Sequence, residues 1–236
     1  MKYSFADYNI TIENRFNRII KQCVGYEKDF ESSDLTVSLS DADFVSEHEI
    51  SDSDYSDSYI ETIGVYRKIA EWLPTKDAFL LHSAVIDVDG VGIAFAAHSG
   101  TGKTTHMGLW QELLGGRMTV VNGDKPIVRF FDSEPTVPYA YGTPWNGKER
   151  LGTNMRTPVR HICFIERAEE NSCEPMNTAD AVDLIFNQVY MPKNPIAIMN
   201  TMGLINRFIG GCKLWNIKCN MDISAAKTAY EAIFGK

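Results

Sequence analysis

The spacing of hydrophobic residues changes near residue 76 of this 236-residue chain. Up to that point the pattern is mixed, with alternating apolar positions in some segments and helical spacing in others. The predicted elements are strands over 5–12 and 35–39, helices over 16–23 and 59–73, and a polar loop over 52–58. Pro74 follows the second helix, so we place a boundary near Pro74–Asp77 and expect a small α+β region over 1–76.

From residue 78 onward, apolar strands alternate with helical segments, which is the pattern of a layered α/β sheet. Two turn signals, Asp89-Gly90 and the stretch from Asp132 to Pro135, divide pairs of strands into predicted hairpins. The predicted strands cover 79–88, 91–96, 118–121, 127–131, 136–140, 161–165 and 213–218, and the predicted helices cover 104–114, 178–190, 196–209 and 223–234. We expect these elements to form one nucleotide-binding domain over 77–236.

The nucleotide-binding expectation comes from a motif between the predicted strand 91–96 and the predicted helix 104–114. Ala97-His-Ser-Gly-Thr-Gly-Lys-Thr-Thr105, called the phosphate loop below, matches the P-loop pattern G-x-x-x-x-G-K-[ST] with alanine at the first glycine. Its glycines let successive amides turn toward an anion, and Lys103 brings an ammonium to the β- and γ-phosphates. The residues predicted to bind the nucleotide are His98, Ser99, Gly100, Thr101, Gly102, Lys103, Thr104 and Thr105.

A magnesium ion normally accompanies such a phosphate site. Thr104 would offer its hydroxyl to Mg²⁺, and an acidic residue is expected at the end of a neighbouring strand. Asp124 follows the strand 118–121, at the edge of the sheet where ligands of α/β proteins collect. We therefore predict Thr104 and Asp124 as metal ligands. The alternative for Asp124 is a structural residue in an Asn-Gly-Asp turn.

At this point the residues resemble a known family. The segment from His98 to Thr105 is similar to the P-loop of ATP-dependent phosphoenolpyruvate carboxykinase. The order of His82-Ser83, hairpin, P-loop, helix, strand and acid resembles the catalytic core of HPr kinase/phosphorylase, which shares that fold. The stretch Gly142–Glu149 resembles small HPr-kinase-like proteins common in Firmicutes. The resemblance covers residues 78–235 and implies an α/β P-loop core with a mixed sheet of the phosphoenolpyruvate carboxykinase/HPr kinase type.

This resemblance implies an ATP-dependent kinase that transfers the γ-phosphoryl group to a Ser or Thr hydroxyl of a small protein or peptide. Asp124 or His82 would accept the hydroxyl proton, although a histidine on a predicted strand is also often a core residue. Lys148 or Arg150, in a loop with turn chemistry, would stabilise the charge of the transition state. His98 and His106 flank the P-loop motif, and neither is expected to take a direct part in the chemistry.

One departure from the family keeps other functions open. HPr kinases carry adjacent acidic residues after the second strand, whereas the neighbours of Asp124 are Gly123 and Lys125. This difference favours a non-catalytic ATP-binding module with a regulatory or adaptor role. A small-molecule hydroxyl kinase is a third possibility, because the basic residues beyond 148 do not distinguish it from a peptide kinase.

The distribution of charged residues along the chain is more informative than the net charge. The chain has 23 Lys and Arg against 31 Asp and Glu, a net charge of −8. Residues 29–61 contain 11 acidic residues and no Lys or Arg, so the acidity belongs to the N-terminal region. The remainder is close to neutral and lacks the basic, aromatic-rich surface typical of nucleic-acid binding. We therefore expect no nucleic-acid partner.

Composition also bears on location. No apolar run approaches the roughly 18 residues needed to cross a bilayer, and no apolar signal segment follows the first residues. The five cysteines have unrelated spacings, which is typical of free thiols in a reducing compartment. We expect a cytoplasmic protein without a membrane partner. The sequence leaves its oligomeric state open.

Overall fold

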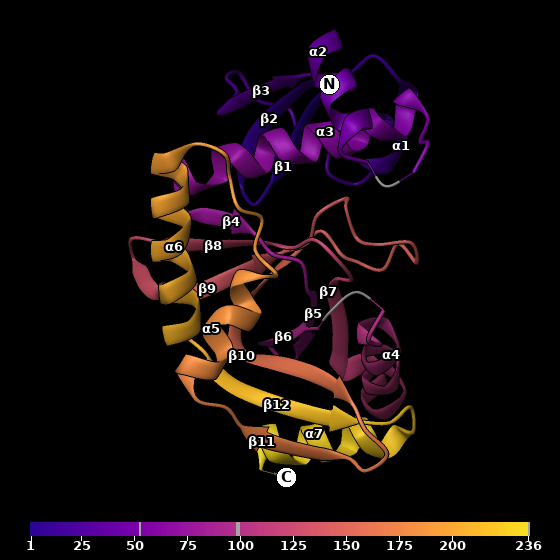
Figure 1. The fold of residues 1–236 in the computed structure, drawn as a ribbon, viewed down its shortest axis with the longest axis vertical. Coiled ribbons are helices and arrows are strands. Elements are labelled where there is room, and N and C mark those ends of the chain that lie inside the picture. Colours follow the sequence, from indigo (N-terminus) through magenta and orange to yellow (C-terminus); the bar gives the residue numbers. More distant parts are fainter. Residues whose placement is uncertain (52, 98–99, 236) are drawn as a thin grey trace.

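The computed structural model describes residues 1–51, 53–97 and 100–235. Within that part of the chain, a small three-stranded sheet near the N-terminus is followed by a nine-stranded mixed sheet, and helices pack on both (Figure 1). No helix of the described residues is both long and apolar enough to span a bilayer. The mixed α/β architecture agrees with the expectation from the sequence.

The small sheet begins with a hairpin. Strand β1 (Lys2–Phe5) pairs antiparallel with β2 (Tyr8–Glu13), and β3 (Leu35–Ser38) pairs parallel with β2. The single strand predicted over 5–12 is therefore wrong. Ala6 and Asp7 form the turn with φ values of 52° and 66°, a left-handed conformation that residues other than glycine seldom adopt.

Three helices accompany this sheet: α1 (Asn17–Gln22), α2 (Asp41–Glu49) and α3 (Asp57–Trp72). Helix α2 was not predicted, since it is mostly polar; it begins with a reciprocal capping box between Ser40 and Asp43. In α3, Glu61 is buried, and its carboxylate accepts the backbone N–H groups of Arg15 and Phe16 ahead of α1. A short 3₁₀ helix, Leu73–Lys76, then leads to the large sheet.

The large sheet has the strand order β4-β8-β9-β10-β6-β5-β7, with β12 beside β10 and β11 beside β12. The strands are β4 (Ala78–Leu80), β5 (Ala84–Val88), β6 (Val91–Ala96), β7 (Met118–Asn122), β8 (Ile127–Phe131), β9 (Glu134–Tyr141), β10 (Arg156–Arg167), β11 (Ser172–Pro175) and β12 (Lys213–Cys219). Strand β10 pairs antiparallel with β9 at its start, and then parallel with both β6 and β12. This long strand therefore connects the two halves of the sheet.

Several predicted strands have different bounds. The segment predicted as one strand over 79–88 is two strands, β4 and β5, interrupted at 81–83. The interruption occurs where Leu81 forms a bridge to Val189 and the His82 amide donates to the Gln188 carbonyl. The strand predicted over 161–165 extends to all of β10, and β11 was not predicted. The Asp89-Gly90 hairpin between β5 and β6 is confirmed, with φ values of 51° and 86°.

Helices cover both faces of the large sheet (Figure 1). They are α4 (Lys103–Leu114), α5 (Thr178–Phe186), α6 (Pro195–Gly210) and α7 (Ile223–Phe234). Alternate residues of β5 enter different cores: Val85 packs with residues of α5 and α6, whereas Ile86 packs with residues of α4 and α7. The helix predicted over 178–190 ends at Phe186.

The N-terminal region and the large sheet share hydrophobic contacts. Side chains of α3, such as Ile60 and Ile69, belong to the same buried cluster as Leu80, Ile127 and Trp145 of the region beyond residue 77. The predicted boundary at 74–77 coincides with the 3₁₀ helix. The division into two domains stays a prediction, and this shared cluster joins the two regions.

Candidate functional site

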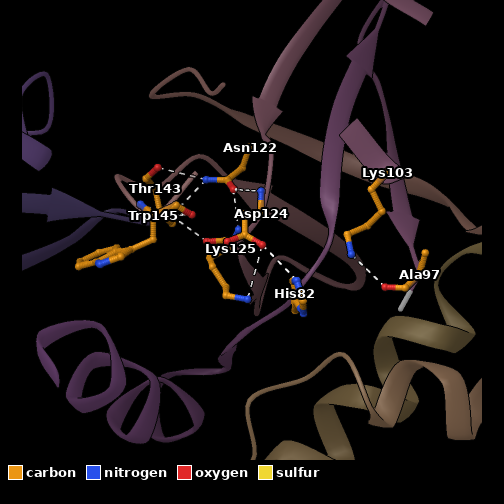
Figure 2. Close-up of polar contacts among 8 residues, drawn as sticks. All are labelled: His82, Ala97, Lys103, Asn122, Asp124, Lys125, Thr143 and Trp145. Atoms are coloured by element: carbon orange, nitrogen blue, oxygen red, sulfur yellow. Dashed lines mark hydrogen bonds and ion pairs between the residues drawn. The ribbon is translucent and has the colours of Figure 1, made fainter. Parts of the chain in front are cut away.

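Three of the predicted site residues lie at one edge of the large sheet (Figure 2). Strand β5 is antiparallel to both β6 and β7, so it begins at the edge where those two strands end. Three groups therefore converge there: His82 just before β5, Lys103 beyond the end of β6, and Asp124 beyond the end of β7 (Figure 2). The arrangement matches the general position of ligand sites in α/β sheets.

Asp124 contacts the side chains of His82 and Lys125. Its Oδ1 is 3.1 Å from Nε2 of His82 and 3.6 Å from Nζ of Lys125. Burial alone would raise the pKa of Asp124, but the contact with His82 and the charges of Lys125 and Lys103 outweigh burial and lower it. Asp124 is therefore a carboxylate at neutral pH. Because both contacts involve Oδ1, the other oxygen, Oδ2, is the candidate ligand for a metal ion or a hydroxyl proton.

Asn122 fixes the turn that carries Asp124. Its side-chain Oδ1 accepts the backbone N–H groups of Asp124 at 2.8 Å and Lys125 at 2.7 Å. Its Nδ2 donates to the carbonyl and the hydroxyl of Thr143, both at 3.1 Å. Asn122 is fully buried. The Asn-Gly-Asp turn that the sequence offered as an alternative is thus present, and it positions the carboxylate.

The segment after β9 supports this turn from the other side. Thr143 donates its hydroxyl to the Lys125 carbonyl at 2.7 Å, and Trp145 donates its indole N–H to the Thr62 carbonyl of α3 at 2.9 Å. Gly142 has no room for a side chain, because a Cβ there would overlap the carbonyl oxygens of Thr153 and Val121. The Gly-Thr-Pro-Trp stretch therefore has a structural explanation, since it connects the Asp124 turn to the N-terminal region.

The described part of the phosphate loop has the backbone expected of an anion cradle. Gly100 and Gly102 have φ values of 78° and 121°, which favour glycine. Lys103 begins α4, and its Nζ donates to the Ala97 carbonyl at 2.9 Å. Burial and the charge of Lys125 lower the pKa of Lys103, while Asp124 opposes this shift. The predicted binders His98 and Ser99 lie outside the described residues.

The other predicted binders differ in exposure. Thr104 is half-buried and Thr105 is exposed, both on the first turn of α4. His106 is buried, and its Nε2 accepts the indole N–H of Trp110 at 3.0 Å. Burial lowers the pKa of His106 to about 4, so it is a neutral core residue.

Lys148 and Arg150 are not brought into contact with Asp124. Both side chains are exposed, and neither forms an ion pair within the described residues. Their loop does approach the site, because a Cβ added to Gly147 would lie 3.4 Å from the Asp124 Cβ. Their role in transition-state stabilisation stays a prediction.

The sequence analysis did not select three residues that contact the site or the phosphate loop, namely Asn122, Lys125 and Arg167. For Asn122, the Asn-Gly turn was a signal in the sequence.

Thr104 and Asp124 carry oxygen donors of the kind that a magnesium ion shared with phosphate oxygens would use. Within 1–51, 53–97 and 100–235, no group of three or more His, Cys, Asp or Glu side chains is arranged to hold a metal. Protein sites for Mg²⁺ accompanying a nucleotide usually supply only one or two oxygens. The Thr104 hydroxyl and Oδ2 of Asp124 are donors of that kind.

Comparison with known proteins gives little further information. No family model matches the chain, and no curated protein matches it. Among solved structures, it is similar to the Hpr(Ser) kinase/phosphatase from Coxiella burnetii, with 10% sequence identity and a TM-score of 0.30 over 55% of this chain and 90% of that chain. At this level the similarity is distant, and only the geometry of the site bears on function.

Proposed function

We propose that the protein is an ATP-dependent phosphotransferase that moves the γ-phosphoryl group to a hydroxyl, namely a Ser or Thr hydroxyl of a small protein or peptide. The convergence of Lys103, Asp124 and His82 at one sheet edge carries the proposal. A phosphate cradle, a carboxylate and a histidine are the groups that such a transfer requires.

The phosphate loop and α4 would bind the triphosphate. Backbone amides of the loop and the positive end of α4 would face the phosphate oxygens. Lys103 would add an ammonium, whose position beside the loop is set by its hydrogen bond to the Ala97 carbonyl. Thr104 and Asp124 would hold Mg²⁺, which neutralises negative charge on the phosphate oxygens when bound.

Asp124 would act as the base. During transfer a bond forms between the acceptor oxygen and the γ-phosphorus, the bond to the bridging oxygen of ADP breaks, and the hydroxyl proton moves to the Asp124 carboxylate. His82, 3.1 Å from Oδ1, would hold the carboxylate in this orientation. Lys148 and Arg150 would contribute to the transition state after movement of their exposed loop.

A second candidate is an ATP-binding module that transfers nothing. It is favoured by the pairing of Asp124 with Lys125, because a lysine stands where a second acid is expected and occupies one carboxylate oxygen. A small-molecule hydroxyl kinase would use the same site and differ only in its acceptor.

The test combines turnover with binding. The protein and its Lys103→Ala variant are incubated with Mg-ATP and the protein or small-molecule fraction of a cell lysate. Mass spectrometry then locates any phosphate gained. We expect Lys103-dependent phosphorylation of a Ser or Thr in the protein fraction. Equal transfer by both proteins would contradict the proposal. A thermal shift with ATP but no transfer to either fraction would favour the binding module.

A further inference from the structure

The phosphate loop is held from a strand that is distant in sequence. Arg167 is the last residue of β10. Its guanidinium donates two hydrogen bonds to the loop backbone: Nη2 to the Gly100 carbonyl at 2.5 Å and Nε to the Thr101 carbonyl at 2.9 Å. Strand β10 runs parallel to β6, with Phe164 opposite Ala96, so Arg167 emerges at the same edge as the loop.

These bonds fix the direction of two backbone amides. In a planar trans peptide the C=O and the N–H point in opposite directions. The carbonyls of Gly100 and Thr101 point at Arg167, so the N–H groups that share their peptide planes, those of Thr101 and Gly102, point away from it. Two successive N–H groups facing one side form a concave anion-binding nest.

The two amides are available to a ligand. Neither the Thr101 nor the Gly102 N–H donates to another backbone group within the described residues. The positive φ values of Gly100 and Gly102 flank them and supply the curvature of the nest. Backbone N–H groups without a protein partner require water or a ligand to satisfy them. The two hydrogen bonds to Arg167 therefore turn two successive N–H groups toward the side on which phosphate oxygens would bind.

We propose that Arg167 is a positioning residue that prepares the phosphate loop for nucleotide binding by clamping the carbonyls of Gly100 and Thr101. This inference rests on the proposed function and adds to it the residue that holds the loop backbone in the conformation that binds phosphate. The clamp requires the forked guanidinium of arginine, because two carbonyl oxygens must accept hydrogen bonds from one side chain. A lysine at this position has the same charge but a single ammonium head, so it does not reproduce the clamp.

Three variants test the clamp in the full chain. Arg167→Met removes both hydrogen bonds, and Arg167→Lys keeps the charge. Arg160→Met is the matched control, because Arg160 is an exposed arginine of the same strand. Affinities for ATP and ADP are measured by titration calorimetry. We expect Arg167→Met and Arg167→Lys each to lose about 10-fold or more, equivalent to about 1.4 kcal/mol, and Arg160→Met to lose less than about 2-fold.

A second measurement does not depend on nucleotide. Hydrogen exchange of the loop amides is compared between wild type and Arg167→Met without ligand. We expect faster exchange at 100–102 and unchanged exchange in β6, because only the loop loses its restraint. Wild-type affinity in Arg167→Lys would overturn the clamp, since charge alone would then suffice. Unchanged exchange in Arg167→Met would also overturn it. If the wild-type protein bound neither nucleotide, the proposed function would fail, while the exchange comparison would still decide the role of Arg167.

Discussion

His82 and Asp124 lie 3.1 Å apart, from Nε2 to Oδ1, because strands β5 and β7 pair in a particular register. Val85 of β5 lies opposite Asn122 of β7. His82 precedes the first of these residues and Asp124 follows the second, so both side chains extend past the same end of an antiparallel pair. The contact therefore depends on sheet register and on the break in the chain between β4 and β5.

This contact predicts different consequences for the two residues. Asp124→Asn should lower kcat by about 10²-fold to 10⁴-fold, because the amide cannot accept the hydroxyl proton. His82→Ala should lower kcat by a smaller factor, since it removes only the group that orients the carboxylate. Both variants should bind ATP without magnesium within a few-fold of wild type. Steady-state kinetics and calorimetry measure these quantities.

The control for this pair is His48→Ala, since His48 pairs with Asp57 in the N-terminal region and lies outside the site. Its kcat should equal that of wild type. A turnover rate unchanged by Asp124→Asn would show that another group takes the proton.

Lys125 should strengthen nucleotide binding. The candidate site holds Lys103 and Lys125 against the single carboxylate of Asp124, so Lys125 gives the site an excess of positive charge. Lys125→Met should weaken ATP binding by about 10-fold at low salt and reduce the salt dependence of the affinity. Calorimetry at two ionic strengths measures both effects. Lys227→Met, on the exposed side of α7, is the control, and equal losses in the two variants would contradict a local role.

Asn122 should contribute strongly to stability. Replacing it with alanine leaves the amides of Asp124 and Lys125 without their acceptor in a partly buried turn. Removal of such a partner costs on the order of 2–4 kcal/mol of the free energy of unfolding. Urea denaturation measures this cost. Asn154→Ala is the control, because that exposed side chain donates one hydrogen bond to the Gly25 carbonyl, and its effect should stay below about 1 kcal/mol.

The sequence predicted those parts of the fold that depend on local patterns. The hairpin at Asp89-Gly90 and the helix after the phosphate loop follow from turn chemistry and apolar spacing, and both are present. The turn at Ala6–Asp7 was missed because alanine, at the first of the two positions, seldom adopts the left-handed conformation. The break at 81–83 was missed because it depends on pairing with residue 189, which no local pattern reveals.

In the candidate site, too, residues with a local sequence signal were predicted and residues that depend on distant contacts were not. The order of strand, loop, helix and acid along the chain is sufficient to predict that Lys103 and Asp124 lie at one sheet edge. Three further residues, Lys125, Asn122 and Arg167, make contacts with groups that the sheet brings together from distant parts of the chain. They could not be predicted, because their sequence neighbours resemble those of ordinary turns or charged strand ends. Conversely, the basic loop with Lys148 and Arg150 had a clear local signal, but its side chains are exposed to solvent.

The segment 77–236 should not fold stably by itself. The N-terminal region covers Leu80, Ile127 and Trp145 in a shared buried cluster, and Arg129 donates to the Ala6 carbonyl at 2.6 Å. Deleting 1–76 exposes that apolar surface, each large side chain of which contributes about 1.5–3 kcal/mol when buried. We expect the fragment to aggregate or to lose cooperative unfolding. Size-exclusion chromatography and thermal denaturation test this, and a monomeric fragment with the full-length midpoint would contradict it.

Two buried histidines should make the protein sensitive to acid. Burial lowers the pKa of His106 and of His161 to about 4, against the ordinary value of 6.5. The unfolded chain therefore binds more protons than the folded protein between these values. The stability associated with neutral imidazoles is complete above about pH 6.5 and falls as the pH drops toward 4, by about 1–3 kcal/mol for each group.

His106→Gln tests this sensitivity while keeping an acceptor for the indole N–H of Trp110. The variant cannot take up the proton, so its free energy of unfolding should fall less steeply between about pH 6.5 and 4.5 than that of wild type. Above about pH 7 the two profiles should run parallel, because His106 is neutral in both states there and contributes no proton uptake. Urea denaturation at a series of pH values measures both ranges. Parallel profiles across the whole range would mean that His106 titrates alike in the folded and unfolded chains, contrary to its burial beside Phe95 and Trp110.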